Sequence, residues 1–191
     1  MTDPWRTEHA PPTERGGRSY LELRREDIET LRRFRNDQIE VLRQEQPIAA
    51  EEQERWFDQI VVPTHRSERP EFLLVSILDS EGVFVGYGGL TSVSWTHCRA
   101  ELSFLVDPER AGDPDTYRSD FLAFLEFLTD WAFEGLGLHR LHSETYSFRT
   151  PTIELLEEAG FVPEGRLREH TSGPDGYVDS LLHGLLTGDA R

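Results

Sequence analysis

The chain has 191 residues, enough for one domain that buries a core and carries a cleft. Its 36 acidic residues against 20 basic ones give a formal net charge of −16, so its surface repels nucleic acid and we expect no nucleic-acid partner. No apolar run approaches the roughly 18 residues that cross a bilayer, and the single cysteine excludes a disulfide framework and a cluster of thiolate zinc ligands.

The N-terminal segment, residues 1–18, is polar and rich in proline and glycine. It lacks the apolar core of a secretory signal, so we expect a disordered tail on a cytoplasmic protein. A second short tail is expected at residues 188–191. This division leaves one domain over residues 19–187.

The first half of the chain predicts one strand, two helices and a hairpin. Apolar and charged residues alternate weakly over 20–23, as in a short strand, and helical spacing follows from Asp27 to Asn36. A second helix is expected after Pro47, behind an acidic first turn. Two strand-like runs, 72–78 and 83–90, then flank a turn and predict a hairpin.

The middle of the chain predicts a strand and a central helix. Residues 100–106 have strand composition, and we expect a loop over 108–114. Asp113 is a favourable N-cap and Pro114 suits the first helical position, so a helix should run from there to Glu134. Its apolar residues recur at intervals of three and four, which predicts that nearly half of its circumference is buried.

The last third predicts a strand over 138–146 and a short helix that begins at Thr150 and ends near Gly160. A terminal hairpin should follow, with strands at 162–170 and 177–186 around a turn rich in glycine and proline. The expected element order is therefore β-α-α-β-β-β-α-β-α-β-β.

Several short sequence motifs occur in a fixed order along these predicted elements. They are Arg35-Asn36-Asp37, Gly86-Tyr87-Gly88-Gly89-Leu90, Arg99-Ala100-Glu101-Leu102, Val106-Asp107-Pro108-Glu109, Gly160-Phe161-Val162-Pro163-Glu164-Gly165-Arg166-Leu167-Arg168 and Tyr177-Val178-Asp179. Over residues 20–186 the series resembles the ribosomal-protein and amino-sugar acetyltransferase branch of the GCN5-related N-acetyltransferase (GNAT) superfamily. The resemblance implies an α/β (α+β) GNAT fold with a central, mixed, twisted sheet of about seven strands and flanking helices.

The resemblance also implies direct transfer of an acetyl group from acetyl-CoA to a primary amine, such as a peptide N-terminus, an amino sugar or another small amine. In this family the fourth and fifth strands splay apart and hold the pantetheine arm like an added strand. Phe104, Leu105 and Val106 match that stretch. The same three residues also suit a buried strand, and the sequence does not separate the two roles.

The family's diphosphate loop, Arg/Gln-x-x-Gly-x-Gly/Ala, is missing. The corresponding segment 109–120 is longer and holds one glycine, and Pro114 lacks a backbone donor. Its aspartates oppose a diphosphate, whereas its guanidinium and hydroxyl groups could bind one. The cofactor-binding candidates are Arg110, Tyr117, Arg118 and Ser119, together with Arg149, which stands where relatives carry asparagine. The segment is either a remodelled CoA site or a structural loop that has lost it.

Two residues are candidates for the chemistry by resemblance. Glu101 matches a cleft-facing glutamate and is the expected base, acting through a water; the alternative is a salt bridge to Arg99 or another arginine. The tyrosine with which many relatives protonate the thiolate is replaced by Leu156. Thr152 matches the small hydroxyl residue of the ribosomal-protein branch, or is an exposed threonine at the helix start.

The acceptor amine is expected near Arg35, Asn36 and Trp95. We expect no metal, because no histidine pair has the helical spacing of a zinc motif, and His139 and His142 should point to opposite sides of a strand. Exposed strand edges indicate a possible homodimer. The alternative function is a GNAT-fold module that has lost CoA and binds a ligand or a protein partner.

All 20 basic residues are arginine, since lysine is absent. An acid-rich, lysine-free composition resembles proteins of salt-loving organisms, where concentrated salt screens the repulsion between like charges. We therefore interpret the composition as halophile-like.

Overall fold

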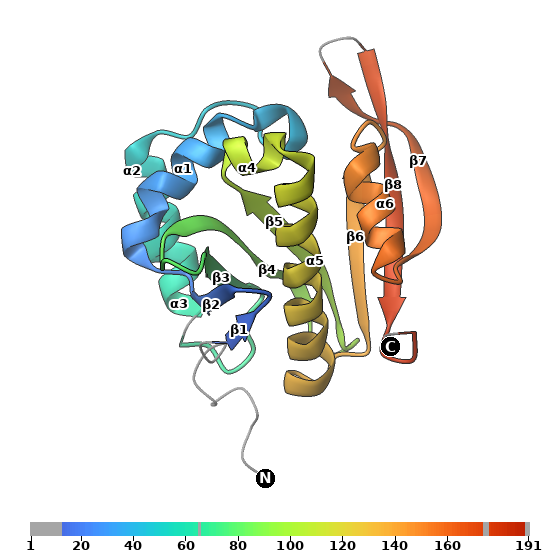
Figure 1. Ribbon diagram of the computed structural model, residues 1–191, viewed down its shortest axis with the longest axis horizontal. Coiled ribbons are helices and arrows are strands. Elements are labelled where there is room, and N and C mark those ends of the chain that lie inside the picture. Colours follow the sequence, from blue (N-terminus) through green and yellow to red (C-terminus); the bar gives the residue numbers. More distant parts are fainter. Residues whose placement is uncertain (1–12, 65, 174–175, 190–191) are drawn as a thin grey trace.

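The computed structural model describes residues 13–64, 66–173 and 176–189. Within them one sheet of eight strands has the order β1-β2-β3-β4-β5-β6-β8-β7, and flanking helices cover it (Figure 1). The strands are β1 (Thr13–Arg15), β2 (Arg18–Glu22), β3 (Leu73–Leu78), β4 (Phe84–Ser94), β5 (Arg99–Val106), β6 (Arg140–Tyr146), β7 (Val162–Gly173) and β8 (Gly176–Leu186). Neighbouring strands are antiparallel except for the parallel pair β5 and β6. The expected fold class is confirmed, with one strand more than the seven predicted.

The four predicted helices are present, together with two short α-helices that were not predicted. They are α1 (Ile28–Asn36), α2 (Ala50–Trp56), α3 (Val62–Thr64), α4 (Pro108–Gly112), α5 (Pro114–Asp130) and α6 (Thr150–Glu158), with π-helical turns at Phe57–Val61 and Trp131–Gly135. The predicted helices correspond to α1, α2, α5 and α6. The predicted start of the central helix is confirmed, because the Asp113 side chain accepts a hydrogen bond from the Thr116 N–H and Pro114 is the first helical residue. No helix among the described residues is long and apolar enough to cross a membrane.

Side-chain alternation along the strands divides the core between the two faces of the sheet. On the α5 face, aromatic residues of α5 such as Phe124 pack with Val106 of β5 in the larger cluster. On the α1 face, Leu31 and Phe57 pack with Leu105, the neighbour of Val106 along the same strand. Helix α6 joins the α5 face through its buried leucines. The strand therefore presents odd-numbered residues to one helical layer and even-numbered residues to the other.

Pairing between β5 and β6 is brief. The two strands are in register only at Arg99 with Arg140, Ala100 with Leu141 and Glu101 with His142. Beyond these pairs β5 continues beside β4 and β6 continues beside β8, so the strands separate, as Figure 1 shows toward the upper end of the view. The separation leaves one edge of residues 102–106 without a neighbouring strand.

Two segments differ from prediction. Residues 13–18, assigned to the disordered tail, form β1 and the turn into β2, so that part of the prediction is wrong; Gly16 and Gly17 supply the positive φ angles of the turn. Residues 1–12 of the predicted tail lie outside the described residues, as do 190–191. The loop expected over 108–114 contains the short helix α4, because Asp107 caps it by accepting from the Glu109 N–H at 2.8 Å.

Substitution of Gly88 in β4 tests how tightly α5 packs on the sheet. A Cβ atom there would lie 2.6 Å from the Phe124 ring and 2.7 Å from the Ser103 carbonyl oxygen. We expect Gly88→Ala to lower the free energy of unfolding by about 1–3 kcal/mol, because the helix would have to shift. Chemical denaturation measures this. The control is Gly112→Ala in α4, where nothing lies within 4 Å and no loss is expected; equal losses in both variants would contradict the packing argument.

Candidate active site

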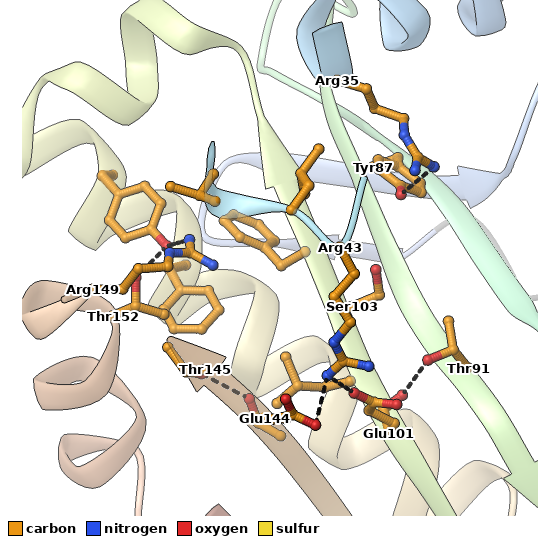
Figure 2. Close-up of a pocket in the computed structure, with 17 residues that line it drawn as sticks. Arg35, Arg43, Tyr87, Thr91, Glu101, Ser103, Glu144, Thr145, Arg149 and Thr152 are labelled. Atoms are coloured by element: carbon orange, nitrogen blue, oxygen red, sulfur yellow. Dashed lines mark hydrogen bonds and ion pairs between the residues drawn. The ribbon is translucent and has the colours of Figure 1, made fainter. Parts of the chain in front are cut away.

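A cavity of about 220 Å³ lies in the gap between β5 and β6. It passes through the sheet, because its wall includes Tyr117 and Thr152 from the α5 face and Glu101 and Arg43 from the α1 face (Figure 2). We call Glu101, Glu144 and Arg43 the carboxylate end, and Tyr117, Thr152 and Arg149 the hydroxyl end. The two ends are joined inside one cavity.

The carboxylate end is held together by one guanidinium group. Arg43 Nη2 lies 2.7 Å from Glu101 Oε1 and 3.4 Å from Glu144 Oε2, and Figure 2 shows it between the two carboxylates. Both glutamates are on the same face, since Glu101 pairs with His142 and Glu144 follows two residues later on β6. Burial lowers the pKa of His142, so its ring is neutral at pH 7. Glu101 thus forms a salt bridge, which was the alternative role expected for it, and its partner is Arg43. The Glu101 side chain also lines the cavity.

The hydroxyl end is formed by two helices. Tyr117 Oη of α5 lies 3.0 Å from Thr152 Oγ1 of α6, and Arg149 Nη2 donates a hydrogen bond to Tyr117 Oη at 3.3 Å. Tyr117 and Thr152 are 9% and 8% exposed. Thr152 is thus not an exposed threonine at a helix start, and Tyr117 lines the cavity instead of joining a phosphate-binding loop.

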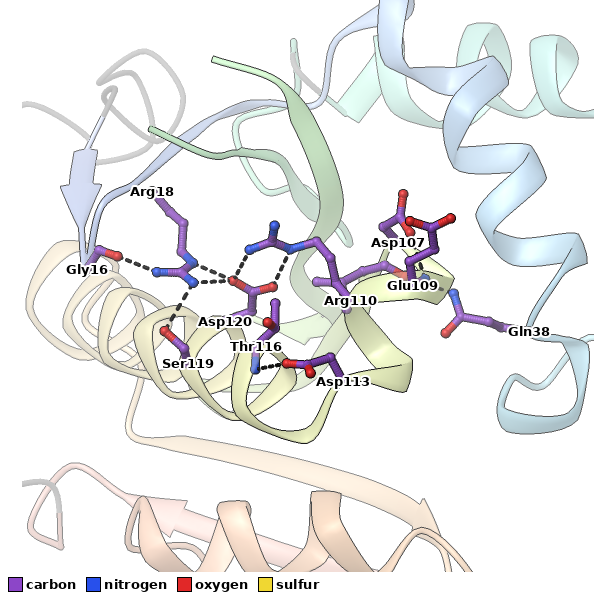
Figure 3. A network of polar contacts seen from close by, with 11 residues as sticks. Gly16, Arg18, Gln38, Asp107, Glu109, Arg110, Asp113, Thr116, Ser119 and Asp120 are labelled. Carbon is purple, nitrogen blue, oxygen red and sulfur yellow. Dashed lines mark hydrogen bonds and ion pairs between the residues drawn. The ribbon is translucent and has the colours of Figure 1, made fainter. Parts of the chain in front are cut away.

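Two of the predicted diphosphate-binding side chains, Arg110 and Arg118, are paired with carboxylates. Arg110 forms two hydrogen bonds with Asp120, at 2.7 and 2.9 Å, and Arg18 reaches the same carboxylate (Figure 3). Arg118 forms an ion pair with Glu158. Ser119 Oγ accepts a hydrogen bond from Arg18 at 3.1 Å. In this conformation the charges of both arginines are thus already paired, and Ser119 is bound to a third arginine.

Two backbone donors at the helix starts are also occupied. The carboxylates of Asp107 and Asp113 accept from the N–H groups of Glu109 and Thr116, each at 2.8 Å, and Pro114 has no N–H. These hydrogen bonds hold the pKa of Asp113 below its usual value, which keeps a negative charge at the start of α5. The loop therefore does not fit a diphosphate.

The other end of a CoA molecule fits better. Phe104, Leu105 and Val106 follow the last β5–β6 pair, and on their other side they pair with β4. Phe104 lines the cavity. The Val106 carbonyl is already bound to Gln38 Nε2 at 2.8 Å, so the arm must use other backbone groups of this edge. Backbone groups along an unpaired strand edge are what an extended pantetheine arm needs. Among the described residues Arg149 has no carboxylate partner, so it is a free cation at the cavity wall.

The predicted acceptor residues are not brought together. Arg35 lines the cavity and donates toward Tyr87 Oη at 3.4 Å. The Asn36 side chain instead holds the backbone of Ile48, just before α2: its Nδ2 donates to the Ile48 carbonyl, and its Oδ1 accepts from the Ile48 N–H. Trp95 donates from Nε1 to the Pro70 carbonyl at 3.0 Å, and neither it nor Asn36 lines the cavity.

Sequence reasoning missed Arg43 and Glu144. Glu144 had a usable signal, because it falls two residues after His142 in a predicted strand and so shares the face of a residue beside Glu101. Arg43 had none, since it stands in an irregular segment whose path depends on the tertiary fold. Within the described parts of the chain no group of three or more His, Cys, Asp or Glu residues is arranged to hold a metal ion.

Comparison with known proteins agrees with the fold. The profile of the family described as an acetyltransferase (GNAT) domain matches residues 22–182. The fold superposes with a TM-score of 0.78 on a spermidine N-acetyltransferase from Vibrio cholerae solved in complex with CoA and spermine, at 20% identity, covering 91% of this chain and 97% of that one. A dodecameric form of that enzyme superposes at 0.73 and 22% identity, covering 90% and 95%.

Curated relatives match more briefly. The Vibrio cholerae spermidine N(1)-acetyltransferase is 26% identical over 91 residues, which are 48% of this chain and 50% of that protein. An uncharacterized N-acetyltransferase, p20, of Bacillus licheniformis is 24% identical over 102 residues, or 53% and 54%. The chain thus spans about half the length of the curated relatives it matches.

Asp120 is predicted to be structural. It is 1% exposed and is the shared partner of Arg18 and Arg110, so Asp120→Asn should lower the free energy of unfolding by about 2–3 kcal/mol by leaving two guanidinium groups without their charge partner. Urea denaturation of this variant and of the exposed control Asp115→Asn measures the difference. Loss of stability in the control alone would contradict the assignment.

Proposed function

The chain belongs to the acetyltransferase (GNAT) family, and on that premise we propose that it transfers an acetyl group from acetyl-CoA directly to a primary amine. The observation that carries this proposal is the single cavity through the split between β5 and β6, with carboxylates at one end and hydroxyl groups at the other. A direct transfer needs both kinds of group around one reacting carbon, since the ammonium group must lose protons and the departing sulfur must gain one.

Glu101 is the proposed base. An ammonium group must lose a proton before its nitrogen can attack, and a carboxylate at the cavity wall can take that proton through a water. The nitrogen lone pair then forms the C–N bond, the C–S bond breaks, and the sulfur leaves with the bonding pair. The bonded nitrogen releases its second proton to water, so that a neutral amide forms. In the structure the Glu101 carboxylate is paired with the Arg43 guanidinium. The ammonium group of the substrate must therefore displace this guanidinium from Glu101. The backbone N–H near Leu105 is the proposed donor to the oxyanion.

The acceptor is proposed to be a cationic small amine, with a peptide N-terminus or an amino sugar as the other candidates. Glu101 and Glu144 together carry two negative charges against the one positive charge of Arg43, which favours a cation at this end. The similar Vibrio cholerae enzyme is a spermidine acetyltransferase. A homodimer through a strand edge remains part of the proposal, and one solved form of that enzyme is a dodecamer.

One observation favours a second function. The carboxylates that occupy the donors of the 107–120 segment suit a GNAT-fold module that has lost CoA and binds a ligand or partner in the same cavity. The two functions differ in one measurable property. An enzyme must bind acetyl-CoA and release its thiol, whereas the module would leave acetyl-CoA intact.

The test is a turnover assay. Purified protein is incubated with acetyl-CoA and either spermidine, glucosamine or a peptide with a free N-terminus, at low and at molar salt because of the acidic surface. Release of the CoA thiol and mass spectrometry of the amine report the reaction. We expect amine-dependent thiol release with spermidine; absence of release with every amine, together with no shift in thermal stability on adding acetyl-CoA, would favour the binding module.

Substitution of the two glutamates separates their roles. Glu101→Gln should lower kcat on the order of 10²- to 10⁴-fold, because the amide cannot accept the proton. Glu144→Gln is the matched control on the neighbouring strand and should mainly raise KM for the amine. Steady-state kinetics on both variants measures this. An unchanged kcat in Glu101→Gln would remove Glu101 as the base.

A further inference from the structure

Protonation of the departing thiolate needs an acid, and the residue that supplies it in many relatives is absent from this chain. Leu156 stands at the position where many relatives carry a tyrosine, and it is fully buried in the apolar core. The chain therefore needs another donor at the hydroxyl end. We propose, on the basis of the proposed function, that Tyr117 is the catalytic residue that donates this proton to the departing sulfur.

The Tyr117 ring is fixed against the wall of the cavity. Tyr117 closes the first turn of α5, where its N–H donates to the Asp113 carbonyl. The ring packs edge-on to Phe104, with centroids 6.1 Å apart, and stacks on Phe121 at 5.8 Å. Phe104 belongs to the unpaired edge of β5, where the pantetheine arm is proposed to lie. A rigid aromatic anchor in that position points one phenol group into the gap.

Two neighbours make the phenol suitable for proton donation. Arg149 donates to the phenol oxygen, which leaves the phenolic hydrogen free to point to Thr152 or to sulfur. When the C–S bond breaks, the sulfur takes the bonding pair and the Tyr117 proton, and a phenolate remains. Arg149 and the Thr152 hydroxyl then both donate to that phenolate, and such hydrogen bonds are strong because one partner is charged. A proton from solvent restores the phenol.

The acid and the base lie on opposite faces of the sheet. Tyr117 approaches from α5, and Glu101 points to the α1 face where Arg43 binds it. The proton removed from the amine and the proton given to sulfur therefore use separate groups at the two ends of one cavity. Tyr87 also lines the cavity, but its strand partner is Leu105, which places it on the α1 face with Glu101.

Tyr117→Phe tests the proposal, because it keeps the ring and removes only the hydroxyl group. With acetyl-CoA and the amine of the panel above that reacts fastest, we expect kcat to fall on the order of 10²-fold while the Kd of acetyl-CoA stays unchanged. The ratio of wild-type kcat to variant kcat should become smaller as the pH rises from 7 to about 9.5. At the higher pH a thiol with a pKa near 8.5 leaves as the thiolate and needs no proton. Thr152→Val should give a smaller loss with the same pH trend.

The control is Tyr20→Phe. It removes a buried hydroxyl group for which the described residues offer no hydrogen-bond partner, on a ring that stacks with Phe127 and does not line the cavity. Wild-type kcat is expected. Three results would overturn the proposal: a wild-type kcat in Tyr117→Phe, a deficit equal at all pH values, or a weaker Kd with kcat unchanged. Should Tyr117→Phe not fold, an absence of any pH trend in Thr152→Val overturns it as well. A wild-type protein that transfers no acetyl group would instead count against the proposed function.

Discussion

The site depends on where the pairing of β5 and β6 ends. Parallel strands in a sheet hydrogen-bond along their shared length, yet here the ladder stops at Glu101 and His142. Because the strands then follow different neighbours, backbone groups of residues 102–106 face a gap, and side chains from both faces of the sheet line that gap. A fully paired sheet would seal the two helical layers from each other, and the carboxylate and hydroxyl ends would not share a cavity.

The acid-rich composition shapes the rest of the site. Carboxylates cap α4 and α5 and pair with Arg18, Arg110 and Arg118, which stabilises the start of the central helix. The same carboxylates occupy the donors with which a helix start binds an anion. If the proposed function is correct, the thioester donor binds mainly through the edge of β5 and Arg149. This division explains how the family fold persists although its usual diphosphate loop is absent.

Local patterns predicted most of the fold. Asp113 and Pro114 located the start of α5 because capping depends on adjacent residues, and the spacing of apolar residues located its buried side. The tail and the 108–114 loop were misassigned at short elements, where a few polar residues give little periodic signal; pairing with β2 and the Asp107 cap decide those structures.

The candidate site was less predictable because its contacts join distant parts of the chain. The resemblance placed Glu101 and Thr152 on the cavity, but the contacts Arg43–Glu101 and Tyr117–Thr152 connect elements that only the tertiary fold brings together. Arg110 and Arg118 are typical phosphate ligands by residue type. Their carboxylate partners, Asp120 and Glu158, became evident only when helix packing was known.

The central claim is that the open edge of β5, and not the 107–120 segment, holds the acyl donor. Isothermal titration calorimetry with acetyl-CoA and with S-acetyl-pantetheine, which lacks the diphosphate, tests it most directly. The account predicts that both bind and that their Kd values differ by less than about tenfold, equivalent to about 1.4 kcal/mol. Failure of S-acetyl-pantetheine to bind while acetyl-CoA binds tightly would contradict it, because the 3′-phospho-ADP part, which includes the diphosphate, would then supply the affinity.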